Sequence, residues 1–425
     1  AVREDDAGRA VRSGLEIVAA VNQLQFTPPL QVRIGLHTGP VVVAEIGTGA
    51  RTEQLALGET PNIAARVQGQ AEPNTVVIST ATYRLVRGLF ECQDLGSQGL
   101  KGVTTPLVLY YVMRKSEAQS RFDAALQKGL TPLIGREEEA RLLFHRWEQA
   151  IAGEGQVILL SGEAGIGKSR LTQALKDHIP QENRSRIEWR CSPYHQNSAL
   201  YPVIEQLQHL LQFGREESPE EKFRKLEVGA RRVMPLHDDA IPLLATLLSL
   251  PLPEHYPPLT FTPQRQKQKT LEALLAWLLQ EAQYQPVLVV VEDLHWVDPS
   301  TLELLSLLID QVLSARVLMV LTFRPDFTPP WAMAAHLTQL TLSRFARRQV
   351  EAMVEKVSSG RALPAEVIQQ IVEKTDGIPL FVEELTKTVL ESVESIESIG
   401  SQSGRSLQAV PIPATLHDSL MARLD

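Results

Sequence analysis

A chain of 425 residues with 44% hydrophobic and 22% charged residues is long enough for two or three domains, each with its own core. Its formal net charge of -8 argues against a general binder of phosphate backbones, which needs a basic face, so we expect no nucleic-acid partner. No apolar run approaches the roughly 20 residues that cross a bilayer, and Cys92 and Cys191 lack the spacing of a disulfide framework or a zinc site, so we expect a cytoplasmic protein without a membrane segment.

The pattern of the sequence divides the chain into four parts. Short β-like and helical runs alternate over residues 1–115, and a polar stretch at 116–130 is interpreted as a linker. Residues 131–342 hold a Gly-rich loop and very apolar strands, and residues 343–425 are helical in pattern. Because Ala1 is not a Met and Asp425 falls inside a helical-looking run, we also expect a fragment of a longer protein.

The first part has the pattern of an α/β or α+β domain. Two strands separated by a turn at Thr38-Gly39-Pro40 are predicted, followed by a helix and two further strands. The predicted strands are Val32–His37, Val41–Val43, Thr75–Ser79 and Pro106–Met113, and the predicted helix is Asn62–Ala71.

Three segments of this part resemble the class III nucleotide cyclases in order and spacing: residues 32–43, Gly58-Glu-Thr-Pro-Asn62-Ile-Ala-Ala-Arg66 and Leu100-Lys101-Gly102. That family makes cyclic AMP or GMP by attack of the ribose 3′-hydroxyl on the α-phosphate, with two metal ions at the interface of two cyclase domains. The resemblance implies that Asn62 and Arg66, which share one helix face, contact the transition state and that Lys101 contacts the triphosphate. By spacing alone, an Asn and an Arg are more often a helix cap and a surface charge.

The first part also departs from that family. Its two metal-binding aspartates lie on strands that precede the position of Asp5, and Asp5 and Asp6 have instead the place of N-terminal acids of a helix. We therefore expect that this stretch alone does not cyclise nucleotides. Glu59 and Pro61 replace the usual Asp and Val, and Leu55 stands where a polar side chain often contacts the base, so the choice between ATP and GTP stays open.

The third part contains a phosphate-binding pattern between a predicted strand, Gln156–Ser161, and a predicted helix from Arg170 to His178. Successive backbone N–H groups of a P-loop surround a triphosphate, and its glycines permit the required positive φ. Lys168 would contact the β- and γ-phosphates and Ser169 would bind Mg²⁺, while the N-terminus of the helix faces the anion. A chance Gly-rich turn is the alternative. The residues that match the P-loop pattern are Gly162, Glu163, Ala164, Gly165, Ile166, Gly167, Lys168 and Ser169, with Arg170 following.

Two further apolar runs carry charged residues at their ends. Val287 to Val291 is predicted to be a strand buried on both faces, and it leads into Glu292 and Asp293. Parallel sheets place their ligands at the carboxyl ends of the strands, so we predict that this acidic pair binds Mg²⁺ and polarises water, and which acid does which stays open. The alternative is a pair that caps the next helix. A second run, Val317 to Phe323, leads into Arg324, which would sense the γ-phosphate.

Four motifs together resemble the signal-transduction ATPases with numerous domains, which are relatives of the AAA+ class. They are Leu133-Ile-Gly-Arg-Glu137, Glu292-Asp-Leu-His-Trp-Val-Asp298, Thr322-Phe-Arg324 and Gly377-Ile-Pro379-Leu-Phe-Val-Glu-Glu384. The resemblance implies that Gly135 and Arg136 lie near the adenine and that Pro379 belongs to a helical lid that touches the nucleotide. It also implies that residues 411–425 begin a winged-helix region. The polar run 391–406 is expected to be a disordered loop.

The predicted fold is a partial cyclase α/β sandwich followed by a P-loop domain with a parallel sheet and a helical lid. The predicted function is ATP-binding signal transduction in which a nucleotide cyclase is coupled to a slow, regulatory ATPase, with Mg²⁺ and ATP as cofactors and self-association through both domains. The alternative is an ATP-dependent scaffold or transcription regulator that uses a degenerate cyclase module for dimerisation. A metabolic kinase fits less well, because a lid signature and a long helical middle suit a switch.

Overall fold

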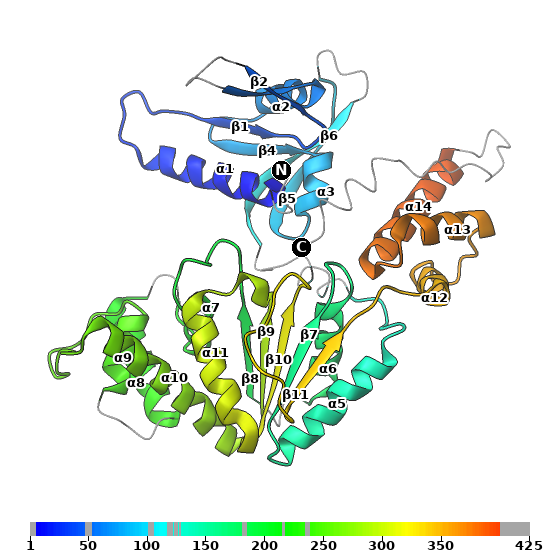
Figure 1. The fold of residues 1–425 in the computed structure, drawn as a ribbon. Coiled ribbons are helices and arrows are strands. Elements are labelled where there is room, and N and C mark those ends of the chain that lie inside the picture. Colours follow the sequence, from blue (N-terminus) through cyan, green and yellow to red (C-terminus); the bar gives the residue numbers. More distant parts are fainter. Residues whose placement is uncertain are drawn as a thin grey trace. The chain divides into compact units, whose positions relative to one another are not determined.

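The computed structural model describes residues 6–46, 53–100, 106–116, 122, 126, 129–180, 185–214, 217–233 and 239–399. Its contacts divide the chain into two compact units, Ala1–Pro132 with Thr388–Asp425 and Leu133–Lys387. The positions of these units relative to one another are not determined (Figure 1). Lys101 and residues 411–425 lie outside the described residues. Among the residues that are described, no helix has the length and apolar character to cross a membrane.

The first unit is built on a mixed four-stranded sheet in the order β1-β4-β6-β5. Strands β1 and β4 are parallel, β6 runs antiparallel to both β4 and β5, and β2 and β3 form a separate antiparallel pair. The strands are β1 (Arg33–Leu36), β2 (Val42–Ile46), β3 (Glu53–Leu57), β4 (Thr75–Ser79), β5 (Phe90–Gln98) and β6 (Leu107–Lys115), and the helices are α1 (Asp6–Gln23), α2 (Glu59–Gly69) and α3 (Thr80–Val86).

Alternate residues of β4 face opposite sides of this sheet. Val76 and Ile78 belong to one apolar cluster with residues of α1 and α3, whereas Val77 belongs to another cluster with Val67 of α2. The backbones of β1 and α2 approach so closely that a Cβ on Gly35 would lie 2.0 Å from the main-chain nitrogen of Gln68. The sheet therefore has helices on both faces.

The second unit contains a five-stranded sheet, all parallel, in the order β11-β7-β10-β9-β8. Figure 1 shows these strands side by side with their carboxyl ends at one edge. The inner strands β7, β9 and β10 are buried along their whole length, as expected for apolar runs with helices on both sides. The strands are β7 (Gln156–Ser161), β8 (Ser185–Arg190), β9 (Val287–Glu292), β10 (Val317–Phe323) and β11 (Leu337–Thr341).

Helices cover both faces of the parallel sheet. Even-numbered residues such as Ile158 and Leu160 pack against α5 and α6, whereas odd-numbered residues such as Val157 pack in the larger cluster with α7 to α11. This arrangement confirms the predicted α/β fold with a parallel sheet. The helices are α5 (Glu137–Ile151), α6 (Lys168–His178), α7 (Tyr201–Leu210), α8 (Pro219–Val233), α9 (Ala240–Leu247), α10 (Pro263–Tyr284) and α11 (Pro299–Gln311).

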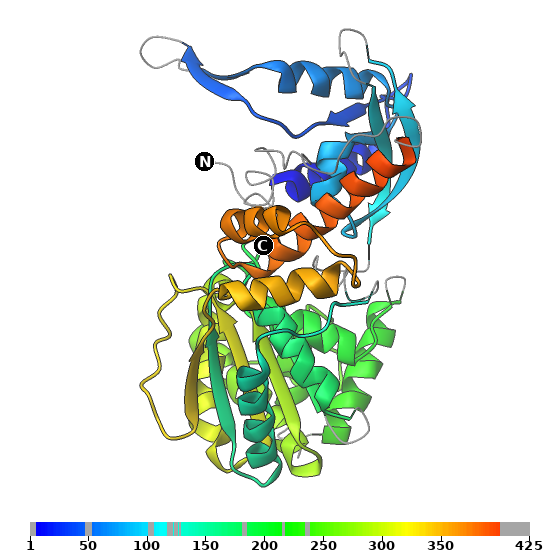
Figure 2. The same ribbon diagram turned by 90° about the vertical axis from the view of Figure 1, so that its right-hand side faces the viewer.

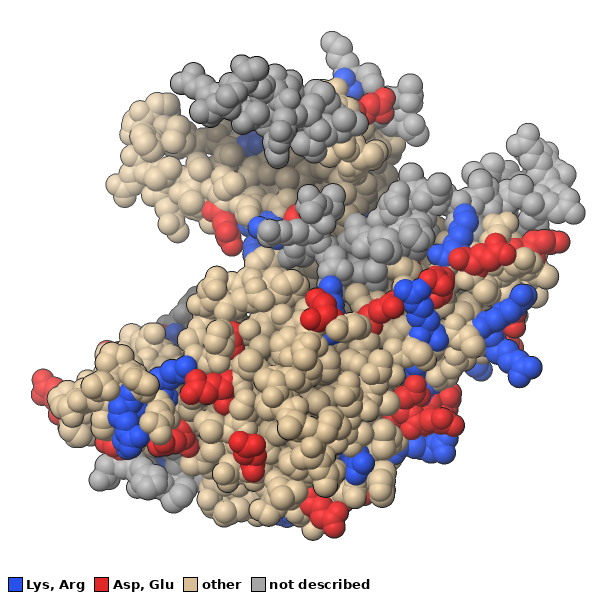
Figure 3. All heavy atoms as spheres, viewed as in Figure 1, with Lys and Arg blue, Asp and Glu red and all other residues tan. Residues whose placement is uncertain are grey.

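Three helices follow the sheet, α12 (Arg347–Val357), α13 (Ala365–Thr375) and α14 (Pro379–Ile399), and we call them the C-terminal helices (Figure 2). Because α14 extends to Ile399, the expectation of a disordered loop from residue 391 is wrong for its first nine residues. Apolar residues such as Val389 and Val393 keep a helical spacing through this polar run, which explains the continuation of the helix. On the face shown in Figure 3, acidic and basic side chains of the second unit are interspersed.

Candidate active site

The residues predicted to form the P-loop, the acidic pair and the γ-phosphate sensor lie at the carboxyl edge of the parallel sheet. Pairing places Phe323 and Thr341 on either side of Ser161, the last residue of β7, and it places Arg190 beside Glu292. Because all five strands run in the same direction, the segments that follow them emerge at this one edge. The P-loop, the acidic pair and Arg324 are therefore brought together by the fold.

The P-loop connects β7 to α6. Gly167, the residue before α6, has a φ of 103°, a conformation that favours glycine. A Cβ on Gly162 would lie 2.7 Å from Cγ2 of Ile166, whose side chain is 1% exposed and anchors the loop in the core. The conformation of the loop is thus fixed by the buried side chain of Ile166 and by two glycines. Gly162 has no space for a Cβ, and Gly167 has a φ that other residues rarely adopt.

Lys168 lies inside the loop and is 9% exposed. Its Nζ donates hydrogen bonds to the carbonyl oxygens of Gly162 and Glu163, at 2.7 and 3.0 Å. Burial lowers the pKa of Lys168 to about 8, an effect that Arg324 increases and Asp293 opposes. The ammonium group is therefore short of compensating negative charge, which a phosphate would supply.

Glu292 and Asp293 have different partners at the end of β9. Oε2 of Glu292, which is 8% exposed, accepts hydrogen bonds from Nε and Nη2 of Arg190 at 3.1 and 2.9 Å. Asp293 has a φ of 58°, and its main-chain N–H donates to Oγ1 of Thr322 at 3.2 Å. Burial and the neighbouring Glu292 raise the pKa of Asp293, while Lys168 lowers it. Asp293 is therefore the acid whose charge acts on the P-loop lysine.

Arg324 and His295 also interact with the P-loop lysine. Arg324 follows β10, and burial lowers its pKa while Asp293 and Asp326 raise it. His295 lies in the short helical turn Leu294–Trp296, and both of its ring nitrogens are buried without a hydrogen-bond partner among the described residues. Burial, and then Arg324, lower the pKa of His295 to about 4, so the imidazole is neutral near pH 7.

Gly135 and Arg136 are packed against the segment that leads to the C-terminal helices. Arg136 is 3% exposed, and its Nη2 donates to the carbonyl oxygens of Ser343 and Ile166, the latter at 3.4 Å. Its guanidinium lies 4.9 Å from the ring centre of Phe345. The side chain of Arg136 thus joins the P-loop to the segment after β11. The sequence did not predict this structural role, and the place of Arg136 near the adenine stays a prediction.

Pro379 and Arg170 lie on helices that border the P-loop. Pro379 is the buried first residue of α14, and the next residue, Leu380, donates its main-chain N–H to the carbonyl oxygen of Gly165 at 3.2 Å. Arg170 and Ser169 belong to the first turn of α6 and are partly exposed. The element predicted to be a lid therefore contacts the P-loop directly.

The predicted cyclase residues lie in the first unit, on α2. Asn62 is exposed, Arg66 is partly exposed, and their spacing places them one turn apart on the helix. Nδ2 of Asn62 is 3.4 Å from the carbonyl oxygen of Gly58, the residue before the helix. This long contact leaves the amide available to a ligand, and the cap position is taken by Gly58 and not by Asn62.

Mg²⁺ is the metal that the donors at this edge would suit. Ser169 offers a hydroxyl at the start of α6. Asp293 offers a buried carboxylate, and a nearby cation would lower its raised pKa and so favour the charged form. Within the described residues, no three His, Cys, Asp or Glu side chains form a metal-binding group. A Mg²⁺ site needs few protein ligands, because this ion usually binds one or two carboxylates together with substrate phosphates and water.

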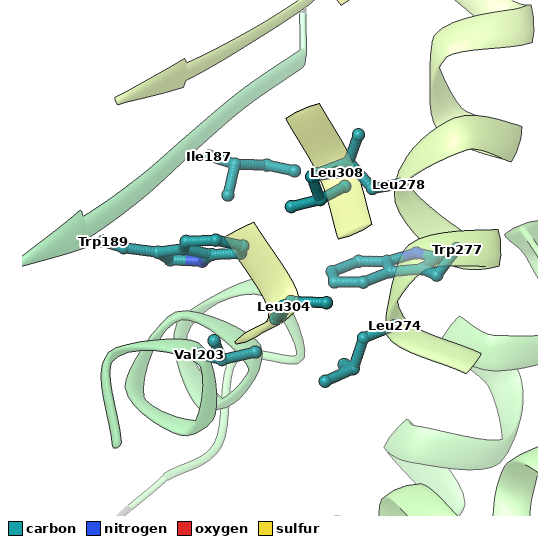
Figure 4. A pocket seen from close by; sticks show the side chains of 8 residues that line it. All are labelled: Ile187, Trp189, Val203, Leu274, Trp277, Leu278, Leu304 and Leu308. Carbon is teal, nitrogen blue, oxygen red and sulfur yellow. The ribbon is translucent and has the colours of Figure 1, made fainter. Parts of the chain in front are cut away.

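A small apolar cavity lies elsewhere in the second unit, between β8, α7, α10 and α11 (Figure 4). The rings of Trp189 and Trp277 face it, together with aliphatic side chains such as Leu304. Its lining carries no charged side chain to bind a phosphate, so it belongs to the core and not to a nucleotide site.

The sequence did not single out two charged residues at the site, Arg190 and Arg344. Arg190 ends β8, whose alternation of Ile187 and Trp189 with charged residues is the signal of a half-buried edge strand. Arg344 follows β11, and its guanidinium donates to Glu163 in the P-loop. For Arg344 we find no signal in the sequence, because its partner is distant along the chain.

Comparison with known families matches the two units separately. The model of the adenylate and guanylate cyclase catalytic domain matches residues 2–114, and the model of an AAA ATPase domain matches residues 132–320. The first match agrees with the cyclase resemblance, and the second agrees with the ATPase resemblance at the level of an AAA ATPase domain.

Individual relatives extend over both regions. An uncharacterized protein of Rhizobium meliloti is 29% identical over 92% of this chain and 38% of its own length, and adenylate cyclase type 10 of Rattus norvegicus is 24% identical over 91% of this chain and 24% of its own length. The chain thus spans well under half the length of these curated relatives. Among solved structures, a guanylate cyclase domain from Catenaria anguillulae in complex with GTP is 28% identical over 26% of this chain and 62% of that one, with a TM-score of 0.25. The chain contains a class III nucleotide cyclase domain and, after it, an AAA ATPase domain.

Proposed function

We propose that the second unit binds MgATP at the carboxyl edge of its parallel sheet and hydrolyses it slowly. The observation that carries this proposal is the buried, undercompensated Lys168, enclosed by its own loop and acted on by Asp293 and Arg324. A triphosphate would replace the two loop carbonyls as acceptor for Nζ, and it would lie against the N-terminus of α6.

In this proposal Mg²⁺, held by Ser169 and Asp293, neutralises phosphate charge. We assign to Asp293 the acid that faces the nucleotide, because its charge acts on Lys168, whereas Glu292 is engaged by Arg190. Arg324 supplies a second cation toward the γ-phosphate. The arrangement provides charge stabilisation and orientation, which are the main contributions of a protein to phosphoryl transfer.

We further propose that the chain is part of a signalling protein in which a nucleotide cyclase is coupled to this ATPase, as a switch of the type found in signal-transduction ATPases with numerous domains. Relatives named adenylate cyclase type 10 match this chain across both units, which supports the pairing of the two domains in one protein. Asn62 and Arg66 are assigned to the cyclase transition state, and self-association is expected through the cyclase domains.

The ATPase proposal is tested by steady-state hydrolysis of MgATP with Asp293→Asn and Glu292→Gln. We expect Asp293→Asn to bind ATP within a few-fold of wild type and to lose at least about a hundredfold in kcat, as single charged contributors to a transition state often do. Equal kcat in Asp293→Asn and wild type would contradict the assignment.

The cyclase proposal requires the full-length protein, assayed for cyclic AMP and cyclic GMP with Asn62→Ala and Arg66→Ala beside wild type. Formation of a cyclic nucleotide that both variants abolish would support it. A full-length protein that binds ATP and makes neither product would favour the ATP-dependent scaffold or regulator.

A further inference from the structure

Arg344 connects the P-loop to the C-terminal helices. Its Nε and Nη2 both donate to Oε2 of Glu163, at 3.0 and 2.8 Å, and its Nη1 donates to the carboxylate of Asp376. Glu163 is the second residue of the P-loop, and Asp376 directly follows α13. One guanidinium thus holds a P-loop carboxylate and a carboxylate of the C-terminal helices at the same time.

Glu163 is held at both its side chain and its main chain. Arg344 binds the carboxylate, while Nζ of Lys168 donates to the main-chain carbonyl oxygen at 3.0 Å. A bound triphosphate would draw Lys168 away from that carbonyl, because a phosphate oxygen is the stronger acceptor. Glu163, which Arg344 binds, would therefore lose its hydrogen bond to Lys168 when a nucleotide binds.

The turn that presents Asp376 has little freedom to adjust. Asp376 and Gly377 both have positive φ, 46° and 71°, and a Cβ on Gly377 would lie 2.4 Å from the carbonyl oxygen of Phe345. Phe345 also donates its main-chain N–H to the carbonyl oxygen of Gly377 at 2.8 Å. Since Phe345 follows Arg344 and Gly377 follows Asp376, the main chains that carry this guanidinium and its acceptor are held together.

The contact between Arg344 and Glu163 is exposed and weak. The side chains of Arg344 and Glu163 are 43% and 46% exposed, and such pairs change an equilibrium constant by about fivefold or less. The neighbouring link, from the N–H of Leu380 to the carbonyl oxygen of Gly165, is a single main-chain bond at 3.2 Å. A contact of this strength is suited to be broken and remade in each nucleotide cycle.

We propose that Arg344 is a positioning residue that keeps the C-terminal helices closed on the P-loop through Glu163 and thereby sets the rate at which nucleotide is released. This inference rests on the proposed binding of ATP at the P-loop. A closed element that contacts the P-loop hinders the exit of a bound nucleotide, and opening of such elements often limits turnover.

The test measures release of a fluorescent ATP analogue, chased with excess ATP in a stopped-flow instrument, from wild type, Arg344→Ala, Glu163→Ala and the double variant. We expect release to be about two- to fivefold faster in each single variant, as the strength of an exposed pair allows, and no faster still in the double variant, because both changes remove the same interaction. Arg344→Lys should fall between wild type and Arg344→Ala, since Lys keeps the charge and loses the planar fork.

Salt provides a readout that a purely structural role would not move. Raising NaCl from 0.05 to 0.5 M (roughly 14 to 4 Å in Debye length) should speed release from wild type toward the rate of Arg344→Ala, and it should change the variant much less. Equal release rates in wild type and Arg344→Ala, or single-variant effects that multiply in the double variant, would overturn the inference. Failure of wild type to bind the analogue, or undiminished binding by Lys168→Ala, would instead overturn the proposed ATP site.

Discussion

Replacing Asp298 by Ala should destabilise the second unit more than any exposed substitution. Asp298 is 2% exposed, and its Oδ1 accepts three main-chain N–H groups, from Leu200 at 3.1 Å and from Ser300 and Thr301 at 3.0 Å each. Its Oδ2 accepts the hydroxyl of Thr301. The carboxylate therefore caps α11 and also holds the loop before α7, where Leu200 has a φ of 58°.

The expected magnitude follows from these bonds. Loss of the helix cap costs about 1 kcal/mol, and leaving the buried N–H of Leu200 without an acceptor costs about 1–3 kcal/mol more. Asp298→Ala should therefore lower the free energy of unfolding by about 2–4 kcal/mol. Asp298→Asn keeps the oxygen that accepts the three N–H groups, so its loss should be about 1 kcal/mol.

Urea unfolding followed by tryptophan fluorescence measures this effect in the second unit alone, because all 5 tryptophans of the chain lie between Leu133 and Lys387. An Asp298→Ala variant that unfolds within about 0.5 kcal/mol of wild type would refute the assigned hydrogen bonds, as would an Asn variant as unstable as the Ala variant.

Three further predictions concern stability and reactivity. Gly35→Ala should prevent native packing of the first unit, because its Cβ would overlap the backbone of Gln68, and a far-UV circular dichroism melt with an unchanged first-unit transition would contradict this. Burial lowers the pKa of His37, so the unfolded state binds more protons and the first unit should lose stability as pH falls through about 6.5. Urea unfolding at pH 7.5 and 5.5 should show this loss reduced in His37→Phe, and an equal loss in both proteins would rule it out. Burial raises the pKa of Cys92 to about 11 and raises that of Cys191 further, so Ellman's reagent should label neither thiol quickly before denaturation, and a rapid native reaction would argue against their burial.

The apolar patterns predicted the centre of each fold well. Thr75–Ser79 and Gln156–Ser161 are strands with the predicted ends, and β9 extends one residue beyond the predicted Val291. These segments are buried along nearly their whole length, so local composition is sufficient to identify them. The helix predicted from Arg170 begins at Lys168 instead, because the first turn of α6 is part of the P-loop.

The edge strands of the parallel sheet were not predicted. β8 and β11 are only partly buried and carry polar residues at alternate positions. Such short, half-polar sequences are hard to distinguish from loops. Partners of the site residues were equally inaccessible, because Arg190 meets Glu292 across 102 positions and Arg344 meets Glu163 across 181. A motif locates the P-loop and the acids, but pairings over such separations depend on the register of the sheet and on the turn at Asp376.

The most direct test of the ATP site is titration calorimetry of MgATP with wild type, Lys168→Ala and Lys267→Ala. Lys267 is an exposed cation on α10 that pairs with Glu303, so its removal is a control for loss of one positive charge. We predict micromolar-range binding, of about -8 kcal/mol, by wild type and Lys267→Ala and no detectable binding by Lys168→Ala. Undiminished affinity in Lys168→Ala, or no binding by a folded wild-type protein, would contradict the assignment of the P-loop as the ATP site.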